Sequence, residues 1–155
     1  MQWAFDNRDT DKAVASALLL INRGANVDAT PPDYGNTPLD RAVEKGLLDV
    51  VRALLDKGAK ASRPPLTVAL GGSRPNTDMA TLLIDRGADI NAISPDNQFT
   101  PLILAIRSKQ IGVVRALLAK GADPNLPGRT GTTPLRAASE SPEIEQLLIQ
   151  AGAKQ

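Results

Sequence analysis

The chain has 155 residues, a length typical of one domain and short for two. Its 18 Lys and Arg residues and 17 Asp and Glu residues are spread through both halves, which excludes the concentrated basic surface typical of nucleic-acid-binding proteins. The absence of Cys and His excludes disulfides, thiolate nucleophiles, the commonest metal ligands and the commonest general base, so we expect no cofactor, no metal site and no catalytic residues.

The first apolar segment runs from Ala13 to Ile21. It is about half of the roughly 20 residues that a membrane-spanning helix needs, and acidic residues outnumber basic ones before it, unlike in a secretory signal. We therefore expect a soluble, cytoplasmic protein without membrane insertion, and an export signal removed from further upstream stays open. We expect the aromatic side chains of Trp3 and Phe5 to cover the N-terminal end of the hydrophobic core. The alternative is that Trp3 anchors a partner protein.

The stretch Asn36–Lys60, NTPLDRAVEKGLLDVVRALLDKGAK, predicts two antiparallel helices. Thr37 is a favourable N-cap, and Asp40 stands three residues after it, as in a capping box. Gly46 permits the left-handed turn that ends the first helix. A second helix with apolar residues at helical spacing follows directly and ends at Gly58.

This two-helix pattern recurs along the chain. The repeated anchor is a Gly-Ala pair, separated by 34, 29, 34 and 31 residues. Its glycines are Gly24, Gly58, Gly87, Gly121 and Gly152. Two aliphatic residues stand four and three positions before each glycine, and the helix-opening phrase returns as TPLDRA at Thr37, TPLILA at Thr100, TPLRAA at Thr133 and, degraded, PPLTVA at Pro64. A period near 33 indicates a repeat architecture.

The last predicted helix runs from Pro142 to Gln150, with Ser141 as its expected cap. Glu143, Glu145 and Gln146 give it a polar outer face. Such a face is typical of a terminal unit that caps a stack of repeats.

These phrases, in this order and at this period, resemble those of the ankyrin repeat family from about Lys12 to Ala153. The resemblance implies an all-α repeat fold, an ankyrin solenoid of about five helix-turn-helix units joined by short β-hairpin loops. The units of this single domain would span roughly residues 1–29, 30–61, 62–92, 93–125 and 126–155.

The sequence departs from the family pattern in two ways. The histidine of the family's helix-opening phrase is replaced by Asp40, Thr67, Ile103 and Arg136, so its hydrogen bonds between units must be lost or made differently. The short spacing from Gly58 to the next helix indicates that one hairpin is truncated, and the same unit carries an insertion, GGSRPN, at residues 71–76.

Three patterns could carry chemistry, and each has a plainer reading. LPGRTGTTPL at residues 126–135 lacks the lysine of a phosphate-binding loop and reads as a hairpin with glycines at positive φ. Asp40 with Glu44, and Glu140 with Glu143, are one helical turn apart, but we expect both pairs to face solvent and to carry no catalysis. Asp28, Asn91 and Asn125 follow the Gly-Ala pairs at like positions. We expect their side chains to bond their own hairpin backbone and not a metal.

The resemblance also implies where a partner would bind. Family members bind other proteins on a concave surface formed by hairpin tips and the exposed side of the first helices. The corresponding hairpin positions here are Asp33, Tyr34, Asn36, Asp96, Asn97, Phe99, Arg129, Thr130 and Thr132, and the helix positions are Glu44, Lys45, Arg107, Ser108, Arg136, Glu140 and Ser141. Tyr34 and Phe99 fall at expected exposed tips and could anchor a partner. The alternative is that Phe99 covers the slot left by Gln98, which replaces the usual hairpin glycine.

The function that this pattern favours is a non-catalytic module that binds one partner protein on that face. The resemblance implies a role as an inhibitor, an immunity protein or an accessory protein, with a toxin or an enzyme encoded nearby as the partner, and a monomer when free. The alternative is a structural or self-associating scaffold piece that uses the shortened hairpin and the GGSRPN insertion as its contact.

Overall fold

The computed structural model describes residues 10–30, 35–71, 75–96 and 98–154. The chain divides into two compact units, Met1–Pro65 and Leu66–Gln155, and each is described by itself. Trp3, Phe5, Asp33, Tyr34 and Asn97 lie outside the described residues, so the expectations placed on them stay predictions.

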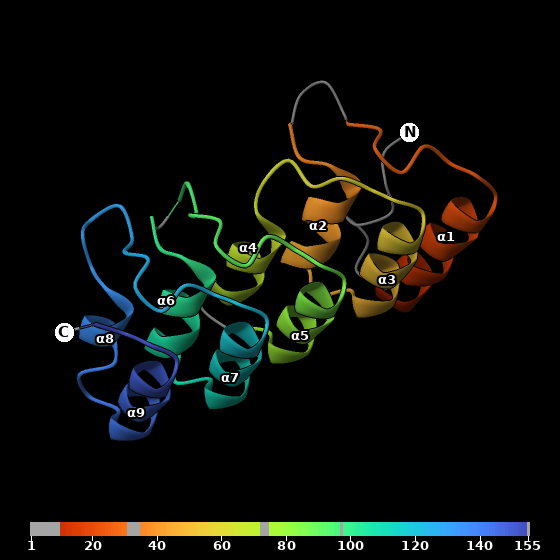
Figure 1. Cartoon of the computed structure of the whole chain (residues 1–155). Helices are drawn as coiled ribbons and strands as arrows, with labels where there is room; N and C mark the ends of the chain where they lie inside the picture. The colour runs from red at the N-terminus through yellow and green to blue at the C-terminus, as the bar shows by residue number, and fades with distance from the viewer. Residues whose placement is uncertain (1–9, 31–34, 72–74, 97, 155) are drawn as a thin grey trace. The chain divides into compact units, whose positions relative to one another are not determined.

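The described residues of the N-terminal unit form the helices α1 (Thr10–Asn22), α2 (Pro38–Glu44) and α3 (Leu48–Asp56). Helix α3 packs against both α1 and α2 (Figure 1). The apolar residues at helical spacing make this core, which includes Ala17, Ile21, Leu39, Val43, Val50, Val51 and Leu54. The predicted corner between α2 and α3 is confirmed, because Gly46 has a φ of 69° there and the N–H of Leu47 donates to the carbonyl of Ala42.

The C-terminal unit contains α4 (Pro65–Gly71, which begins at the last residue of the N-terminal unit), α5 (Thr77–Asp85), α6 (Pro101–Arg107), α7 (Ile111–Ala119), α8 (Pro134–Ala137) and α9 (Pro142–Gln150). The longer helices form one layer, in which α7 lies between α5 and α9 (Figure 1). The short helices α6 and α8 pack side by side in a second layer, α6 against α7 and α8 against α9. The largest buried side chains between these helices include Leu83, Leu102, Leu117, Ile144 and Leu148.

The helix starts follow the predicted capping chemistry with one exception. The hydroxyls of Thr37, Thr100 and Thr133 accept hydrogen bonds from the backbone N–H three residues on, and a proline stands directly after each. Ser141 occupies the N-cap position of α9, but its side chain makes no capping hydrogen bond. The expectation that Ser141 caps through its hydroxyl is therefore wrong, although the predicted bounds of α9 are confirmed.

The connections between helix pairs are turns, and the described part of the chain contains no strand. Two of the loops close on themselves, because the N–H of Ser94 donates to the carbonyl of Phe99 and the N–H of Gly128 donates to that of Thr132. Residues 57–64 between α3 and α4 make a shorter connection than residues 86–100 or 120–133, as the truncated hairpin predicts. Gly131 has the expected positive φ in the last of these loops, whereas Gly128 does not.

The polar residues after the Gly-Ala pairs bond the next repeat, and not their own hairpin as expected. Asp28 accepts from the N–H of Lys60 at 2.7 Å, Asn91 from that of Asp123 at 3.0 Å, and Asn125 from that of Lys154 at 2.8 Å. The bonds within each loop are made by residues two positions earlier: Asn26, Asp89 and Asp123. These links tie each loop to the one that follows it, within each unit.

Asp40 is buried, with 1% of its surface exposed, so the expectation that it faces solvent is wrong. One of its carboxylate oxygens accepts from the N–H of Thr37 at 2.8 Å and from the N–H of Ser62 at 3.1 Å, and both hydroxyls donate to the same oxygen. The other oxygen accepts from the N–H of Arg63 at 3.4 Å. Asp40 therefore replaces the histidine of the family pattern as the residue that makes hydrogen bonds between repeats, here to Ser62 and Arg63.

The environment of the Asp40 carboxyl favours its charged form. Burial alone would raise its pKa, but the hydrogen bonds from Ser62 and Thr37 outweigh burial and hold the pKa below its usual range. Beside it, the Arg63 guanidinium forms an ion pair with Glu44, the last residue of α2. Of the other residues in the histidine position, Thr67 and Ile103 are buried and Arg136 is exposed.

Candidate functional site

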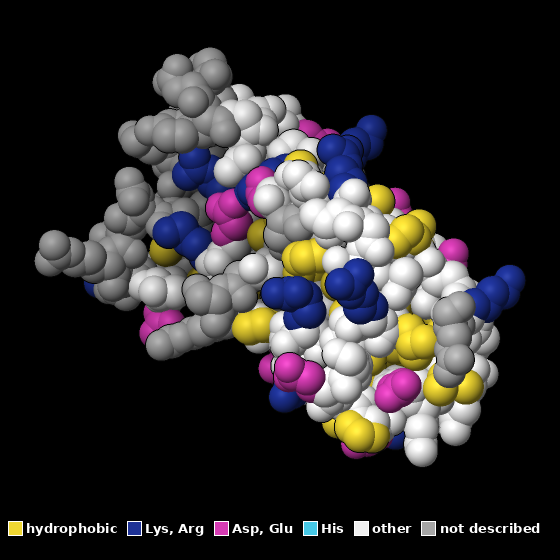
Figure 2. All heavy atoms as spheres, turned by 90° about the vertical axis from the view of Figure 1, so that its left-hand side faces the viewer, with side chains coloured by type: hydrophobic (Ala, Val, Ile, Leu, Met, Phe, Trp, Pro, Cys, Tyr) yellow, Lys and Arg dark blue, Asp and Glu magenta, His cyan; other side chains and the backbone are white. Residues whose placement is uncertain are grey.

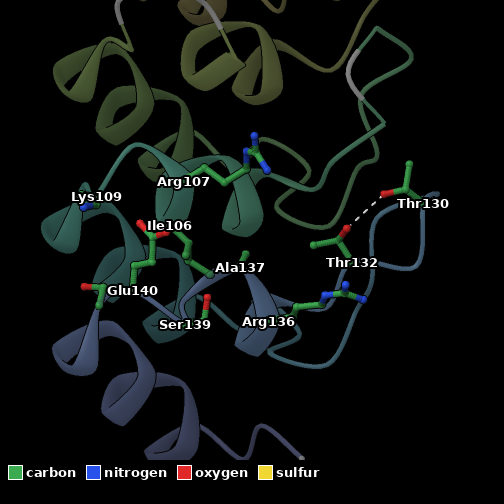
Figure 3. A pocket seen from close by; sticks show the side chains of 10 residues that line it. Ile106, Arg107, Lys109, Thr130, Thr132, Arg136, Ala137, Ser139 and Glu140 are labelled. Atoms are coloured by element: carbon green, nitrogen blue, oxygen red, sulfur yellow. Dashed lines mark hydrogen bonds between the residues drawn. The ribbon is translucent and has the colours of Figure 1, made fainter.

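A polar groove of about 580 Å³ opens on the C-terminal unit (Figure 3). Its wall is formed by the C-terminal end of α6, the loop before α8, α8 itself and the turn that leads to α9. The residues that line it are Ile106, Arg107, Lys109, Thr130, Thr132, Arg136, Ala137, Ser139, Glu140 and Ser141. The groove therefore combines two separate segments of chain, residues 106–109 and 130–141, on one surface.

The charges in the groove are mainly positive. Arg107, Lys109 and Arg136 are exposed basic residues, and Glu140 is the acidic residue of the lining. None of the three basic side chains forms an ion pair with another described residue. Figure 3 shows Arg107 and Arg136 on the adjacent helices α6 and α8, and the hydroxyls of Thr130 and Thr132, 3.2 Å apart, on the loop. The groove offers donors and positive charge to whatever binds there.

Arg107 is held at the rim by an aromatic ring. Its guanidinium carbon lies 4.9 Å from the centroid of the Phe99 ring, within the range of a cation–π contact. Phe99 is only half-exposed, so the expectation of a freely exposed aromatic tip is wrong. Gln98 stands before Phe99 with a φ of 62°, where the family pattern has a glycine, and Gly128 of the following loop packs against Gln98 and the Phe99 ring.

Two successive loops touch at Gly128. The N–H of Arg129 donates to the carbonyl of Gln98 at 2.9 Å, which joins the loop before α8 to the loop before α6. A Cβ added to Gly128 would lie 2.8 Å from the carbonyl oxygen of Gln98 and 3.0 Å from the Phe99 ring. Only glycine allows this approach, so Gly128 sets the position of the groove's loop relative to α6.

Lys109 occupies a backbone conformation that favours glycine. Its φ is 54°, and its N–H donates to the carbonyl of Ile106 at 2.9 Å. The equivalent residue in the N-terminal unit is Gly46, with a φ of 69° and the same bond to Val43. A lysine in this left-handed region costs about 1 kcal/mol relative to glycine.

The groove brings together six of the predicted partner-binding residues that are described, and the others lie elsewhere. Arg107, Thr130, Thr132, Arg136 and Glu140 line it, together with Ser141. Near it, Arg129 and Asp96 are exposed on the loops, whereas Ser108 is half-buried and donates its hydroxyl to the carbonyl of Leu104. In the N-terminal unit, Glu44 and Lys45 are exposed and Asn36 is half-buried.

Sequence reasoning missed Lys109, Ile106, Ala137 and Ser139 as groove residues. One signal for Lys109 is present in the sequence, since it stands at the position that corresponds to Gly46 in the stretch Asn36–Lys60. Ile106 lines the groove from α6, and Ala137 and Ser139 line it where the four-residue helix α8 ends. Nothing in the repeat phrase marks these three residues.

Charge on the molecular surface is mixed. The face shown in Figure 2 carries basic and acidic side chains interspersed with hydrophobic and uncharged ones. Within the residues described, no group of three or more His, Cys, Asp or Glu is placed to hold a metal ion. No helix in the described ranges is both long and apolar enough to cross a membrane.

The family model described as ankyrin repeats (3 copies) matches residues 2–64 and 66–155. The chain belongs to the ankyrin repeat family. A crystal structure of an ankyrin repeat domain from Acinetobacter baumannii has a TM-score of 0.79 and 30% identity, and the match covers 94% of this chain and 79% of that one. The predicted all-α ankyrin repeat fold is thus confirmed.

Similar sequences occur in longer proteins. The human transient receptor potential cation channel subfamily A member 1 is 34% identical over 77% of this chain and 11% of its own length. A putative ankyrin repeat-containing protein of Treponema pallidum is 35% identical over 72% of this chain and 39% of its own. Zygote-specific protein 3 of Chlamydomonas reinhardtii is 31% identical over 95% of this chain and 40% of its own length. The chain therefore spans less than half the length of these relatives.

Ankyrin repeats generally mediate protein–protein interaction, and the fold is typically non-catalytic. The groove of this chain suits that role, because its walls come from the loop and the first helices of two successive repeats.

Replacing Gly128 with alanine tests the contact between the two loops. The added methyl group would meet the backbone carbonyl of Gln98, which cannot rotate away, so we expect a loss of about 1–3 kcal/mol in the free energy of unfolding. The matched control is Gly112→Ala on α7, where a Cβ meets nothing within 4 Å and should raise stability by up to about 1 kcal/mol. Urea unfolding followed by circular dichroism measures both; equal effects of the two substitutions would contradict the assigned contact.

Proposed function

We propose that this chain is a non-catalytic ankyrin module that binds one partner protein through the groove between α6, α8 and their loop. The observation that supports the proposal most is the groove itself, where exposed basic side chains from two repeats have no ion-pair partner among the described residues. Arg107 and Arg136 are its central contacts, with Thr130, Thr132 and Glu140 around them. The exposed Lys45 and Glu44 and the half-buried Asn36 are further contact positions on the N-terminal unit.

The biological role that we propose is that of an inhibitor, an immunity protein or an accessory protein, acting on a toxin or an enzyme encoded nearby. The free protein would be a cytoplasmic monomer. A purified partner separates these roles: an inhibitor or immunity protein lowers the partner's activity when it is added in equal amount, and an accessory protein raises it.

Site-specific photo-cross-linking tests the binding face. A benzoylphenylalanine residue in place of Ser139, which lines the groove, should form a covalent adduct with one protein in an extract of the source organism. The matched control has the same residue in place of Gln146, which is exposed on α9 and does not line the groove. Excess unmodified chain should abolish the adduct at position 139.

The alternative function, self-association as a scaffold piece, gives a different result. The adduct at position 139 would then be a dimer of the chain itself, and sedimentation velocity would show dimers at tens of micromolar. Equal adduct formation at positions 139 and 146 would place the partner elsewhere and would contradict the proposed face.

A further inference from the structure

We infer that the groove recognises an acidic segment of the partner, a stretch of protein chain that presents two or more carboxylates to Arg107, Lys109 and Arg136. This inference rests on the proposed function and specifies the chemistry of its partner. The three basic residues come from α6, the turn after it and α8, and Glu140 is the single acidic residue among the described residues of the lining.

The charge of this groove is local and is not a property of the whole chain. The full sequence has a formal net charge of +1, so the cations of the groove do not reflect a generally basic surface. Arginine side chains without an ion-pair partner can each accept a carboxylate in a bidentate hydrogen-bonded pair. Two such arginines on neighbouring helices, with a lysine on the turn after α6 in the same groove, match carboxylates that are spaced along one peptide segment.

The repeat equivalents show that the positive charge belongs to this groove and not to the repeat pattern. Arg107 is the last residue of α6, and the last residue of α2 is Glu44, which is already paired with Arg63. Lys109 stands where the N-terminal unit has Gly46, although its φ of 54° favours glycine. A lysine in a backbone conformation that favours glycine costs stability, so a contact outside the chain explains its presence better than the stability of the fold does.

The groove is also partly organised before binding. Arg107 is held over the Phe99 ring, and the hydroxyls of Thr130 and Thr132 are joined. A side chain that is already held loses less conformational entropy when a carboxylate binds. We therefore expect even a short acidic peptide to bind without any other part of the partner.

A nucleic acid fits the same cations less well. Proteins that bind single-stranded nucleic acids typically offer aromatic side chains on which bases stack, and no aromatic residue in the described part of the chain lines the groove. The nearest ring, Phe99, already has the Arg107 guanidinium over it. The acidic protein segment is therefore the occupant that the observations favour.

The test is a titration of the ¹⁵N-labelled protein with hexaglutamate, followed by NMR. We expect shifts of the backbone amides at residues 106–109 and 130–141, and an affinity that falls as NaCl is added. The double variant Arg107→Glu with Arg136→Glu should bind the peptide at least about tenfold more weakly. The matched control is Arg52→Glu with Lys154→Glu, which changes the net charge equally at exposed positions away from the groove and should leave the affinity unchanged.

The variant Lys109→Gly separates a binding role of Lys109 from a structural one, because the two roles predict different changes in stability and in affinity. Removing the strained lysine should raise the midpoint of urea unfolding while it weakens binding of hexaglutamate about threefold or more. A variant that is more stable and binds less well cannot owe its lost binding to misfolding.

Several outcomes would overturn the inference: no amide shifts, shifts outside the groove, equal weakening by the control variant, or tighter groove binding by a single-stranded thymidine oligonucleotide than by hexaglutamate. The proposed function is tested separately. If the cross-link at position 139 persists in the Arg107→Glu and Arg136→Glu variant, the protein-binding face stands and the acidic partner is wrong. If the cross-link never forms although hexaglutamate binds the groove, the face recognises carboxylates but the proposed protein partner is wrong.

Discussion

Asp40→Ala is expected to lower the free energy of unfolding by about 2–4 kcal/mol, because hydrogen bonds to a buried charged group are strong and the N-cap is weakened as well. The substitution removes the acceptor for the N–H groups of Thr37 and Ser62 and leaves them without their carboxylate in a buried site. Urea unfolding at neutral pH measures the loss. A surface carboxylate provides the control: Asp85 is exposed, with a long ion pair to Lys120, and Asp85→Ala should change stability by less than about 0.5 kcal/mol.

The pH dependence follows from the lowered pKa of Asp40. A carboxyl whose pKa is lower in the folded than in the unfolded state stabilises the fold above the unfolded value, and this contribution is lost as the pH falls through the folded value. At neutral pH Asp40→Asn should be less stable than the natural protein, because its amide presents N–H groups to donors. The difference should shrink at acidic pH, where the natural carboxyl is itself protonated. A difference that stays constant from neutral to acidic pH would mean that the charge of Asp40 does not matter.

The helices could be predicted because their signals are local and repeated. The Thr-Pro-Leu phrases place the N-caps of α2, α6 and α8, and the glycines at 46 and 58 end the two helices of one repeat. Each of these residues determines the structure within a few positions of itself, as the capping threonines do through hydrogen bonds to the backbone three residues on. Because the same phrases recur at a nearly fixed period, the helices predicted in one repeat support those predicted in the others.

The polar contacts between repeats could not be predicted from these signals. Asn91 is suited both to a turn in its own loop and to a bond with a neighbouring loop, and its sequence context does not distinguish the two. The choice is made by Asp89, which already accepts from the N–H of Asn91 and leaves the Asn91 side chain for the next repeat. Asp40 is similar, since its burial depends on the shortened connection that brings the backbone of Ser62 to it.

The candidate groove could be predicted in part. Arg107, Thr130, Thr132 and Arg136 stand at positions that the repeat pattern places on the first helices and loops, and they line one hollow. Phe99 lies in the predicted loop but is half-buried and not exposed, because it is partly covered by a glycine 29 residues later, Gly128. Side-chain positions that depend on the neighbouring repeat need the structure.

Leu117→Ala is the other substitution with a large expected effect, a loss of about 2–5 kcal/mol in the free energy of unfolding, because it opens a cavity in a closely packed layer. Leu117 has no exposed surface, and its helix, α7, packs against α5, α6 and α9 at once. The neighbouring residue provides the matched control. Leu118 lies on the same helix but is only half-buried, so Leu118→Ala removes the same atoms and should cost clearly less.

The same pair of variants separates the stability of the layer from the chemistry of the groove. Neither leucine lines the groove, so a folded Leu117→Ala protein at low temperature should bind hexaglutamate with the affinity of the natural chain, while its unfolding midpoint is much lower. Equal destabilisation by the two substitutions would mean that burial of α7 does not decide stability. Loss of peptide binding in a Leu117→Ala protein that is still folded would mean that the positions of Arg107 and Lys109 at the end of α6 depend on the packing of α7 beneath them.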